Sequence, residues 1–199
     1  MPRIQATLKS VSPILMNPMT DELLEDLWGG SAKRKTRVEQ TMEAAAESKL
    51  IRDENDRVGI PAEYLLAALV TAGKFVKYDA RKNFSTTGSS LVPSFIFLED
   101  MFYPFKDQKT KHVVDKRRGV LNNGGKEVAV CIVRPRIDVW EFDVTAGFAD
   151  IDPSKVKQIF EYAGKVAGLG DFRPSCRGPF GRFTVSKWEV VEDALPMAA

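Results

Sequence analysis

The segment from Gly168 to Arg182, GLGDFRPSCRGPFGR, constrains the fold of this 199-residue chain more than any other stretch. It contains four glycines, two prolines and three arginines. Glycine permits left-handed backbone and close backbone approach, and arginine presents a planar, permanently charged group that suits phosphate. Two interpretations are open at this point: a loop that holds a phosphate-bearing chain, or an ordinary Gly/Pro connection with solvated arginines.

The residues on both sides of this loop predict regular elements. Apolar and polar residues alternate over 139–148, which is typical of a half-buried strand. Asp152 followed by Pro153 predicts the start of a helix. After the loop, residues 183–191 predict a strand whose alternation slips between Val185 and Trp188, which indicates a bulge.

The N-terminal part of the chain supplies the other half of a frame. Residues 4–8 alternate as a strand, and the segment 60–78 has helical spacing after an N-terminal proline. We therefore expect an α+β fold with a ferredoxin-like (RRM-like) βαββαβ sheet and its helices on one face. The segments 17–56 and 79–136 would be insertions into a single domain spanning 1–199.

Composition excludes several classes of protein. Hydrophobic residues make up 44% of the chain, which is ordinary for a globular protein, and the net charge of +2 gives no global argument for nucleic acid. The chain has only Cys131, Cys176 and His112 as candidate soft zinc ligands, so a Cys/His zinc site is excluded. We expect a cytoplasmic protein, since neither a signal peptide nor an apolar membrane-spanning run is found.

The glycine-rich loop does not match the common nucleotide-binding motifs. It lacks the Gly-Lys-Ser/Thr ending of a Walker loop, and Arg173 stands where a dinucleotide fingerprint would have its third glycine. Those motifs also run strand, loop, helix, whereas this segment runs helix, loop, strand. No nucleotide cofactor, and no other cofactor, is expected.

Local clustering of cations points to a polyanionic partner instead. Clusters occur at 33–37, 109–136 and 173–182, and the second holds eight Lys or Arg residues against two acidic ones. Asn122-Asn123-Gly124-Gly125 is a strong turn signal and makes the second cluster a long basic hairpin. Each cluster alone is typical of a solvated surface, but the three together favour a nucleic-acid partner.

Three segments resemble the RAMP superfamily of CRISPR-associated RNA-binding proteins, and more narrowly the repeating backbone subunit of the effector complexes. IQATLKSVSPILM (4–16) resembles the family's first strand and its "G-x-SPLL" turn, with Ser10 where glycine is usual. GIPAEYLLAAL (59–69) resembles its "IPGSSLKGALR" helix start, with Glu63 and Tyr64 replacing the serines and without the basic ending. The loop 168–182 resembles its C-terminal glycine-rich loop.

The resemblance implies a non-catalytic protein that polymerises along a guide RNA. Each copy would hold a short segment mainly through phosphate and ribose, so that sequence is read by base pairing. The basic hairpin would match the family's thumb, which interrupts pairing between guide and target. Partners would be guide or other single-stranded RNA, a complementary target, further copies of the chain and other effector subunits, with no membrane. The departures allow a distant member, for instance one encoded by a mobile element.

These inferences name the residues expected to contact RNA. The glycine-rich loop would hold phosphates through its arginines and backbone amides, the segment 33–37 would add a second contact, and the hairpin would face the strand or a neighbouring subunit. The residues are Gly168, Gly170, Arg173, Arg177, Gly178, Gly181, Arg182, Lys33, Arg34, Lys35, Arg37, Lys116, Arg117 and Arg118. Three aromatic side chains among them could stack on bases or fill the core: Phe172, Phe180 and Phe183.

Two other hypotheses are open. One is an RNA endonuclease of the same superfamily, in which His112, or Asp21 or Asp26 with a metal, would carry the chemistry. The other is a structural assembly protein of a phage or mobile element, whose basic loops would meet acidic protein surfaces.

Overall fold

A four-stranded antiparallel sheet forms the centre of the molecule. The computed structural model describes residues 1–19, 21–29 and 41–191. Its main sheet has the order β4-β8-β1-β9, with β4 at Ile96–Leu98, β8 at Glu141–Phe148, β1 at Arg3–Ser10 and β9 at Phe183–Val191. Every neighbouring pair is antiparallel. The fold class is therefore α+β, as expected.

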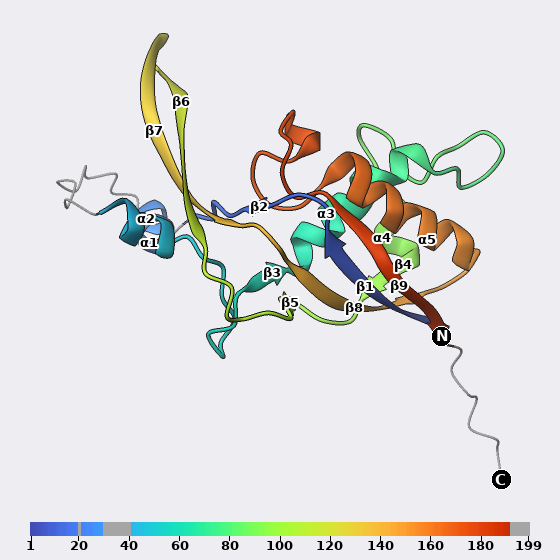
Figure 1. Cartoon of the computed structure of the whole chain (residues 1–199). Helices are drawn as coiled ribbons and strands as arrows, with labels where there is room; N and C mark the ends of the chain where they lie inside the picture. Colours follow the sequence, from blue (N-terminus) through green and yellow to red (C-terminus); the bar gives the residue numbers. More distant parts are fainter. Residues whose placement is uncertain (20, 30–40, 192–199) are drawn as a thin grey trace.

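Two helices cover one face of this sheet (Figure 1). They are α3 (Ala62–Ala72) and α5 (Pro153–Tyr162). The alternation in β1 places Ile4, Ala6 and Leu8 in the core beneath them. α5 begins as expected, because the side chain of Asp152 accepts from the Ser154 amide and Pro153 occupies the first turn. Short helical turns follow α3 at Gly73–Phe75 and α5 at Ala163–Ala167, and α4 is the single turn Val92–Phe95.

The last strand contains the bulge that its sequence indicates. β1 pairs with β9 so that Thr7 lies opposite Lys187, whereas Leu8 lies opposite Val185. Ser186 is the extra residue, and its hydroxyl donates to the Thr7 carbonyl. The bulge lets both Val185 and Trp188 pack against the core despite their spacing in sequence.

The strand β4 comes from within the segment 79–136 that was expected to be an insertion. Pro93 lies in α4, one turn before the strand, and therefore does not interrupt it. Ile96 then pairs with Phe148 at the edge of the main sheet. Two excursions, one on each side of β4, therefore replace the single insertion.

The basic hairpin projects from the body (Figure 1). It consists of β6 (Val113–Asn123) and β7 (Lys126–Ile137), joined at Gly124-Gly125. The Asn122 side chain accepts from the Gly125 amide, and both glycines have positive φ, which confirms the expected turn. The base of β7 also pairs with β2 (Ile14–Leu15), so the hairpin is tied to the N-terminal segment.

Small elements surround the base of the hairpin. They are α1 (Asp21–Trp28), α2 (Met42–Glu47), β3 (Gly59–Pro61) and β5 (Phe102–Pro104). β3 pairs with β5, and α2 packs against both strands of the hairpin. A Thr41 hydroxyl caps α2. No helix in the described ranges is long and apolar enough to cross a membrane.

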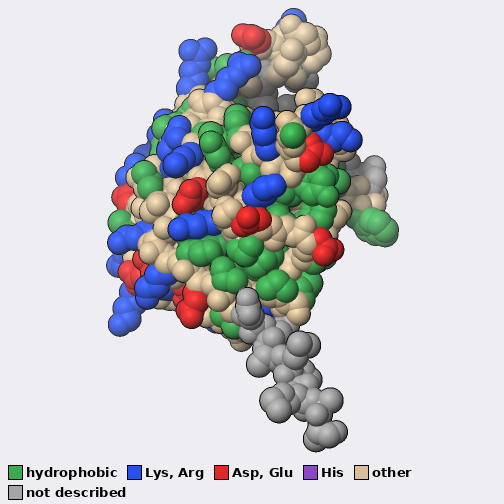
Figure 2. Space-filling model, turned by 90° about the vertical axis from the view of Figure 1, so that its right-hand side faces the viewer, with side chains coloured by type: hydrophobic (Ala, Val, Ile, Leu, Met, Phe, Trp, Pro, Cys, Tyr) green, Lys and Arg blue, Asp and Glu red, His purple; other side chains and the backbone are tan. Residues whose placement is uncertain are grey.

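The end of the molecule away from the hairpin has a mixed surface. Figure 2 shows Lys and Arg side chains interspersed there with acidic and apolar ones. No single sign of charge dominates this face.

Candidate nucleic-acid interface

The glycine-rich loop is a compact, strained structure. Positive φ occurs at Gly168, Gly170, Phe172, Arg177 and Gly181. A Cβ at Gly170 would lie 2.3 Å from the Leu15 carbonyl oxygen, and one at Gly181 would lie 1.8 Å from the Leu169 carbonyl oxygen. These glycines are needed because the loop packs directly against backbone. Left-handed backbone at a non-glycine residue is unfavourable, and residues in such conformations are common at functional sites.

Several amides of the loop are occupied within the protein. The Gly168 amide donates to the Ala163 carbonyl, the Gly178 amide to the Arg173 carbonyl, and the Gly181 amide to the Pro13 carbonyl. The amides around Gly168, Gly170 and Gly178 were expected to hold phosphates. Because the amides of Gly168, Gly178 and Gly181 are bonded internally, the structure gives these glycines the role of shaping the loop.

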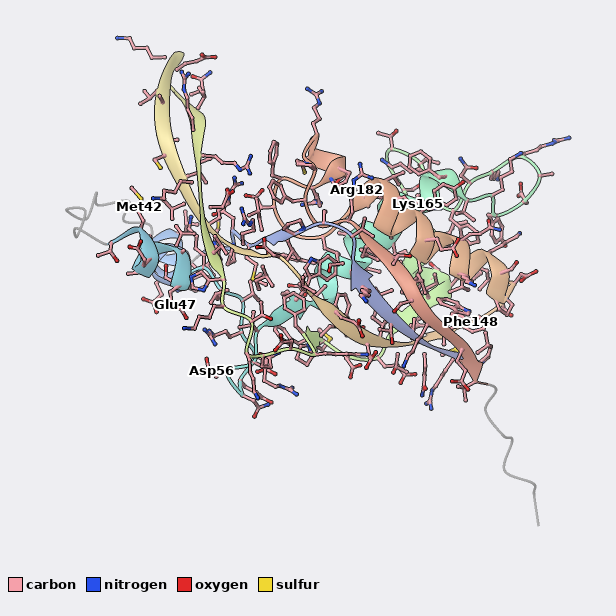
Figure 3. All side chains as sticks on the ribbon, viewed as in Figure 1. Met42, Glu47, Asp56, Phe148, Lys165 and Arg182 are labelled. Atoms are coloured by element: carbon pink, nitrogen blue, oxygen red, sulfur yellow. The ribbon has the colours of Figure 1, made fainter. Side chains whose placement is uncertain are left out.

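The three arginines of the loop point to different surroundings. Arg173 lines a pocket and donates through Nη1 to the Gly170 carbonyl over 2.8 Å. Arg177 is exposed just after the 3₁₀ turn Pro174–Cys176. Arg182 lies beside Lys165 and donates to its carbonyl, where it closes the end of the helical turn after α5 (Figure 3). The structure therefore separates Arg182 from the pocket that Arg173 lines.

A pocket of about 380 Å³ lies between the loop and the first turn of α3. Its polar lining comes from Asn17, Glu63, Tyr64, Asp171 and Arg173. The tyrosine pKa is raised, chiefly by burial and also by the two nearby carboxylates, while Arg173 acts in the opposite direction. The pocket thus brings together two of the three segments that carry the family resemblance, the α3 start and the glycine-rich loop.

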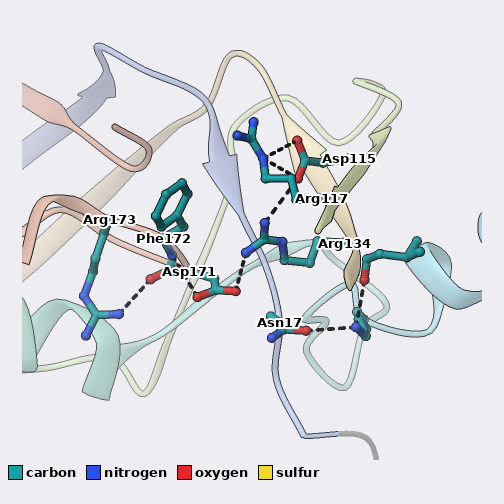
Figure 4. A network of polar contacts seen from close by, with 10 residues as sticks. Asn17, Asp115, Arg117, Arg134, Asp171, Phe172 and Arg173 are labelled. Atoms are coloured by element: carbon teal, nitrogen blue, oxygen red, sulfur yellow. Dashed lines mark hydrogen bonds and ion pairs between the residues drawn. The ribbon is translucent and has the colours of Figure 1, made fainter. Parts of the chain in front are cut away.

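A buried arginine joins the hairpin to this loop (Figure 4). Arg134 of β7 donates through Nη1 to Asp171 over 2.8 Å and through Nη2 to Asp115 over 3.3 Å. Its side chain is 6% exposed, as is that of Asp115. Its Nε has no hydrogen-bond partner among the described residues. A charge this deeply buried is tolerated because both carboxylates compensate it.

A second arginine packs on the aromatic residues of the loop. The Arg117 guanidinium lies 4.8 Å from the ring centroid of Phe180 and 5.9 Å from that of Phe172. Its Nε donates to Asp115 over 3.0 Å. The two rings contact each other, with centroids 6.1 Å apart. They therefore support the hairpin through a cation–π contact, while the third aromatic residue, Phe183, is buried in the core against Trp140.

The remaining basic residues of the hairpin lie on its other face. Side chains alternate along β6, so Arg117 faces the loop together with Asp115, whereas Lys116 and Arg118 face away. Both are exposed. The expected cluster 116–118 is thus divided. Arg117 positions the hairpin, whereas Lys116 and Arg118 are accessible to a polyanion.

A lysine on the segment after α2 extends the network. Lys49 Nζ donates to the Asn17 side chain over 2.9 Å and to the Val133 carbonyl over 2.7 Å. Burial, and next the positive charge of Arg134, lower the pKa of this lysine. Lys49 thereby ties the segment 17–19 to the hairpin base.

Sequence reasoning missed the residues that join the hairpin to the loop: Lys49, Asp115, Arg134 and Asp171. One signal was available, because Asp115 is an acidic residue among the cations of an expected hairpin strand, as an internal partner would be. Nothing in the sequence pairs it with Arg134 rather than with a neighbour. Asp171 lay inside the loop but was not singled out.

The other expected site residues fall into two groups. Lys33, Arg34, Lys35 and Arg37 lie outside the described residues, as do the side chains of Asp21 and Asp26. His112 is described: its Nδ1 lies 3.4 Å from a carboxylate oxygen of Glu47, at the hairpin base. Within the described part of the chain, no group of three or more His, Cys, Asp or Glu side chains is placed to hold a metal ion.

Comparison with known proteins shows a likeness to solved structures. No model of a known protein family matches the sequence, and no curated protein matches it. Among solved structures, the chain is similar to a chain in a cryo-EM structure of the Type III-B Cmr-beta bound to cognate target RNA. The TM-score is 0.53 and the sequence identity 15%.

This likeness extends over nearly the whole chain. It covers 96% of this chain and 61% of the matched chain, so the protein spans less than two thirds of the length of that neighbour. At this identity the comparison shows a shared fold.

Proposed function

We propose that this protein is an RNA-binding backbone subunit that assembles in several copies along a guide RNA in a CRISPR-like ribonucleoprotein and supports target recognition. The observation that carries the proposal is the shared fold with a chain of an RNA-bound Cmr-beta structure over 96% of this protein. The basic hairpin, anchored on the glycine-rich loop by Arg134, supports it independently.

The proposal includes a RAMP-like, ferredoxin-like domain. Taken in chain order, the strands of the main sheet are β1, β4, β8 and β9, with α3 between the first two and α5 between the last two. Their spatial order β4-β8-β1-β9 is the one that a βαββαβ unit forms. A single domain over 1–199 would carry helical segments within 17–56, and the hairpin as a thumb.

Phosphate contacts are assigned to exposed cations on the hairpin and the loop. These are Lys116 and Arg118 on the outer hairpin face and Arg177 at the loop tip. Arg173, half-buried at the pocket, is proposed to contact RNA there without holding a phosphate. The segment with Lys33, Arg34, Lys35 and Arg37 is proposed as a further contact on its sequence alone. Such contacts hold a strand without reading its bases, which suits a subunit that repeats along a guide.

The partners follow from this role. They are guide RNA, a complementary target, further copies of the chain that form a filament, and other effector subunits. A cytoplasmic location is part of the proposal. The grip on RNA uses only side chains of this chain and needs no cofactor.

The test is RNA binding by the purified full chain. A labelled single-stranded RNA of about 30 nucleotides is titrated by fluorescence anisotropy from about 50 to 200 mM salt, where several phosphate contacts would lower affinity steeply. Light scattering of the complex counts the copies on each RNA. We expect several copies, and a weaker complex with DNA of the same sequence.

Two results would contradict the proposal separately. If the chain binds no RNA at the lowest salt concentration, the RNA-binding role is wrong. If a single copy binds regardless of RNA length, the chain binds RNA but is not a repeating backbone subunit. Incubation of the same RNA with and without Mg²⁺ shows whether the protein cuts it, which would favour the endonuclease hypothesis.

A further inference from the structure

The pocket between α3 and the glycine-rich loop has the wrong charge balance for a phosphate. Its lining includes two carboxylates, Glu63 and Asp171, and one cation, Arg173. One N–H group of that arginine is already bonded to the Gly170 carbonyl. The Gly168 amide donates to the Ala163 carbonyl, so it adds no donor to the pocket. Because Arg134 already compensates Asp171, the charges of Glu63 and Arg173 remain, and a phosphate would meet about as much repulsion as attraction in this pocket.

The same groups suit a neutral ring with both donors and acceptors. Asp171 is occupied, because its oxygens accept from Arg134 and from the Phe172 amide. Glu63 has no hydrogen bond or ion pair to any other described residue, and its carboxylate offers two adjacent acceptors. Arg173 keeps further N–H donors. The half-buried ring of Tyr64 forms an aromatic wall beside them.

We propose that this pocket holds a guanine base of the bound strand, with its N1–H and N2–H₂ donors on Glu63 and its O6 and N7 acceptors on Arg173. Guanine presents two adjacent donors on one edge and two acceptors that arginine recognises on another, whereas the other three bases lack this combination. The proposal rests on the proposed function, since the strand must reach the pocket, but it adds a base preference to a grip that otherwise ignores sequence.

Volume and position agree with this ligand. The pocket of about 380 Å³ is larger than a single base, so the ribose can enter with it. Figure 4 shows Arg173 and Asp171 side by side, next to the Arg134 bridge to the hairpin. A strand that follows the base of the hairpin can reach the pocket, and one unstacked base can turn into it.

Glu63 also has a structural explanation, which the experiment must separate. It lies in the first turn of α3, where a negative charge favours the helix dipole. That explanation predicts an effect of Glu63→Gln on stability alone. A base-recognition role predicts an effect on the ratio of affinities for two RNAs, which a small change in stability does not alter.

The experiment compares two RNAs of about 30 nucleotides, oligo-U and a UUG repeat, by anisotropy under one salt condition. We expect the full-length protein to bind the UUG repeat at least about five-fold more tightly than oligo-U. This factor is the lower end of the base discrimination that one good bidentate contact provides. Glu63→Gln should clearly lower this ratio, although the Arg173 contact keeps part of the preference. It should leave oligo-U binding within about two-fold, since one exposed charge contributes little. Glu54→Gln removes an exposed carboxylate that does not line the pocket; it is the matched control and should keep the preference.

A third RNA isolates the proposed contact. Replacing guanine by inosine in the repeat removes only the 2-amino group, and should weaken binding to the wild-type protein but not to Glu63→Gln. Equal affinities for oligo-U and the UUG repeat would overturn the guanine site and leave the RNA-binding function standing. Absence of binding to every RNA would overturn both. A preference that Glu63→Gln leaves unchanged would also overturn the assignment.

Discussion

The guanidinium of Arg134 donates to the carboxylate of Asp171 over 2.8 Å, and this contact joins two segments 37 residues apart in sequence. One partner lies at the base of the basic hairpin and the other in the glycine-rich loop. The same guanidinium also holds Asp115 on the neighbouring strand of the hairpin. The direction in which the hairpin leaves the body therefore depends on the conformation of the loop.

Removing the charge at Asp171 should destabilise the protein. Asp171→Asn leaves Arg134 buried with only the longer contact to Asp115, so we expect the free energy of unfolding to fall by about 1–3 kcal/mol. The measurement is urea unfolding followed by circular dichroism. Asp138→Asn is the control, because it breaks an exposed pair with Arg136 and should cost less than about 1 kcal/mol. Equal losses would show that the buried bridge has no special role.

The stack of Arg117 on Phe180 should require the planar guanidinium. Arg117→Lys keeps the charge but loses the flat contact and the Nε bond to Asp115. We expect a loss of about 0.5–1 kcal/mol in unfolding free energy and faster hydrogen exchange of hairpin amides. Arg118→Lys, one residue further on the opposite face, is the matched control and should change neither quantity. A similar effect of both substitutions would contradict the stacking role.

Three glycines separate backbone strain from steric clash. Gly170 has a φ of 73° and a neighbouring carbonyl 2.3 Å from its would-be Cβ, Gly124 has a φ of 59° and open space, and Gly88 has open space without positive φ. Replacing Gly124 by alanine should lower the unfolding free energy by about 1–2 kcal/mol through backbone strain alone. The same replacement should cost more than that at Gly170. At Gly88 it should leave stability unchanged or raise it slightly. Thermal unfolding of the three variants gives this order. A different order would mean that the loop relaxes around the added methyl group.

Local patterns predicted the regular elements well. The alternation in β1, the bulge after Val185, the turn at Gly124 and the cap at Asp152 each depend on neighbours in sequence, so the sequence displays them directly. β4 was missed as a member of the main sheet because it has only three residues and follows Pro93 closely. Its pairing with β8 is a long-range contact that periodicity does not report.

The candidate site was predicted in position but not in detail. The sequence located the loop, the α3 start and the hairpin, and the structure brings the first two together around one pocket. It did not show that Arg182 would turn to the Lys165 carbonyl, or that Arg117 would stack inward while its neighbours face solvent. These outcomes depend on which partner lies within reach after folding, and three adjacent arginines or lysines look alike in sequence.

The open face of the sheet carries a pH-dependent contact between Thr7 and Asp143. Burial alone would raise the pKa of Asp143, but hydrogen bonds from Lys106 and Thr7 outweigh it, so the pKa lies below its ordinary value. Because the pKa of Asp143 is lower in the folded than in the unfolded protein, where it is about 4, the ionised carboxylate stabilises the fold above that pH. This stabilisation is lost as the pH falls through the pKa of the folded state. Thr7→Val should therefore be most destabilising near neutral pH, and its effect should shrink below about pH 4.

Unfolding free energies from urea titrations at several pH values test this contact. Thr71→Val is the control, because the Thr71 hydroxyl donates to the Ala67 carbonyl and involves no titrating group. Its effect should be the same at every pH. If Thr7→Val lowers the unfolding free energy equally at every pH, its effect comes from packing and not from the contact with Asp143.

The outer face of the hairpin should set the salt dependence of RNA binding. Lys116 and Arg118 are exposed and face away from the loop, so each can neutralise one phosphate without disturbing the Arg134 bridge. Replacing both by alanine should weaken RNA binding and reduce the slope of log affinity against log salt by about 1.4, that is about 0.7 for each phosphate contact with a single strand. The control replaces Lys77 and Lys157, two exposed lysines of which the second lies in α5. It removes the same net charge and should leave the slope nearly unchanged. If both pairs lower the slope equally, RNA responds to total charge rather than to the hairpin, and the hairpin is not the contact surface.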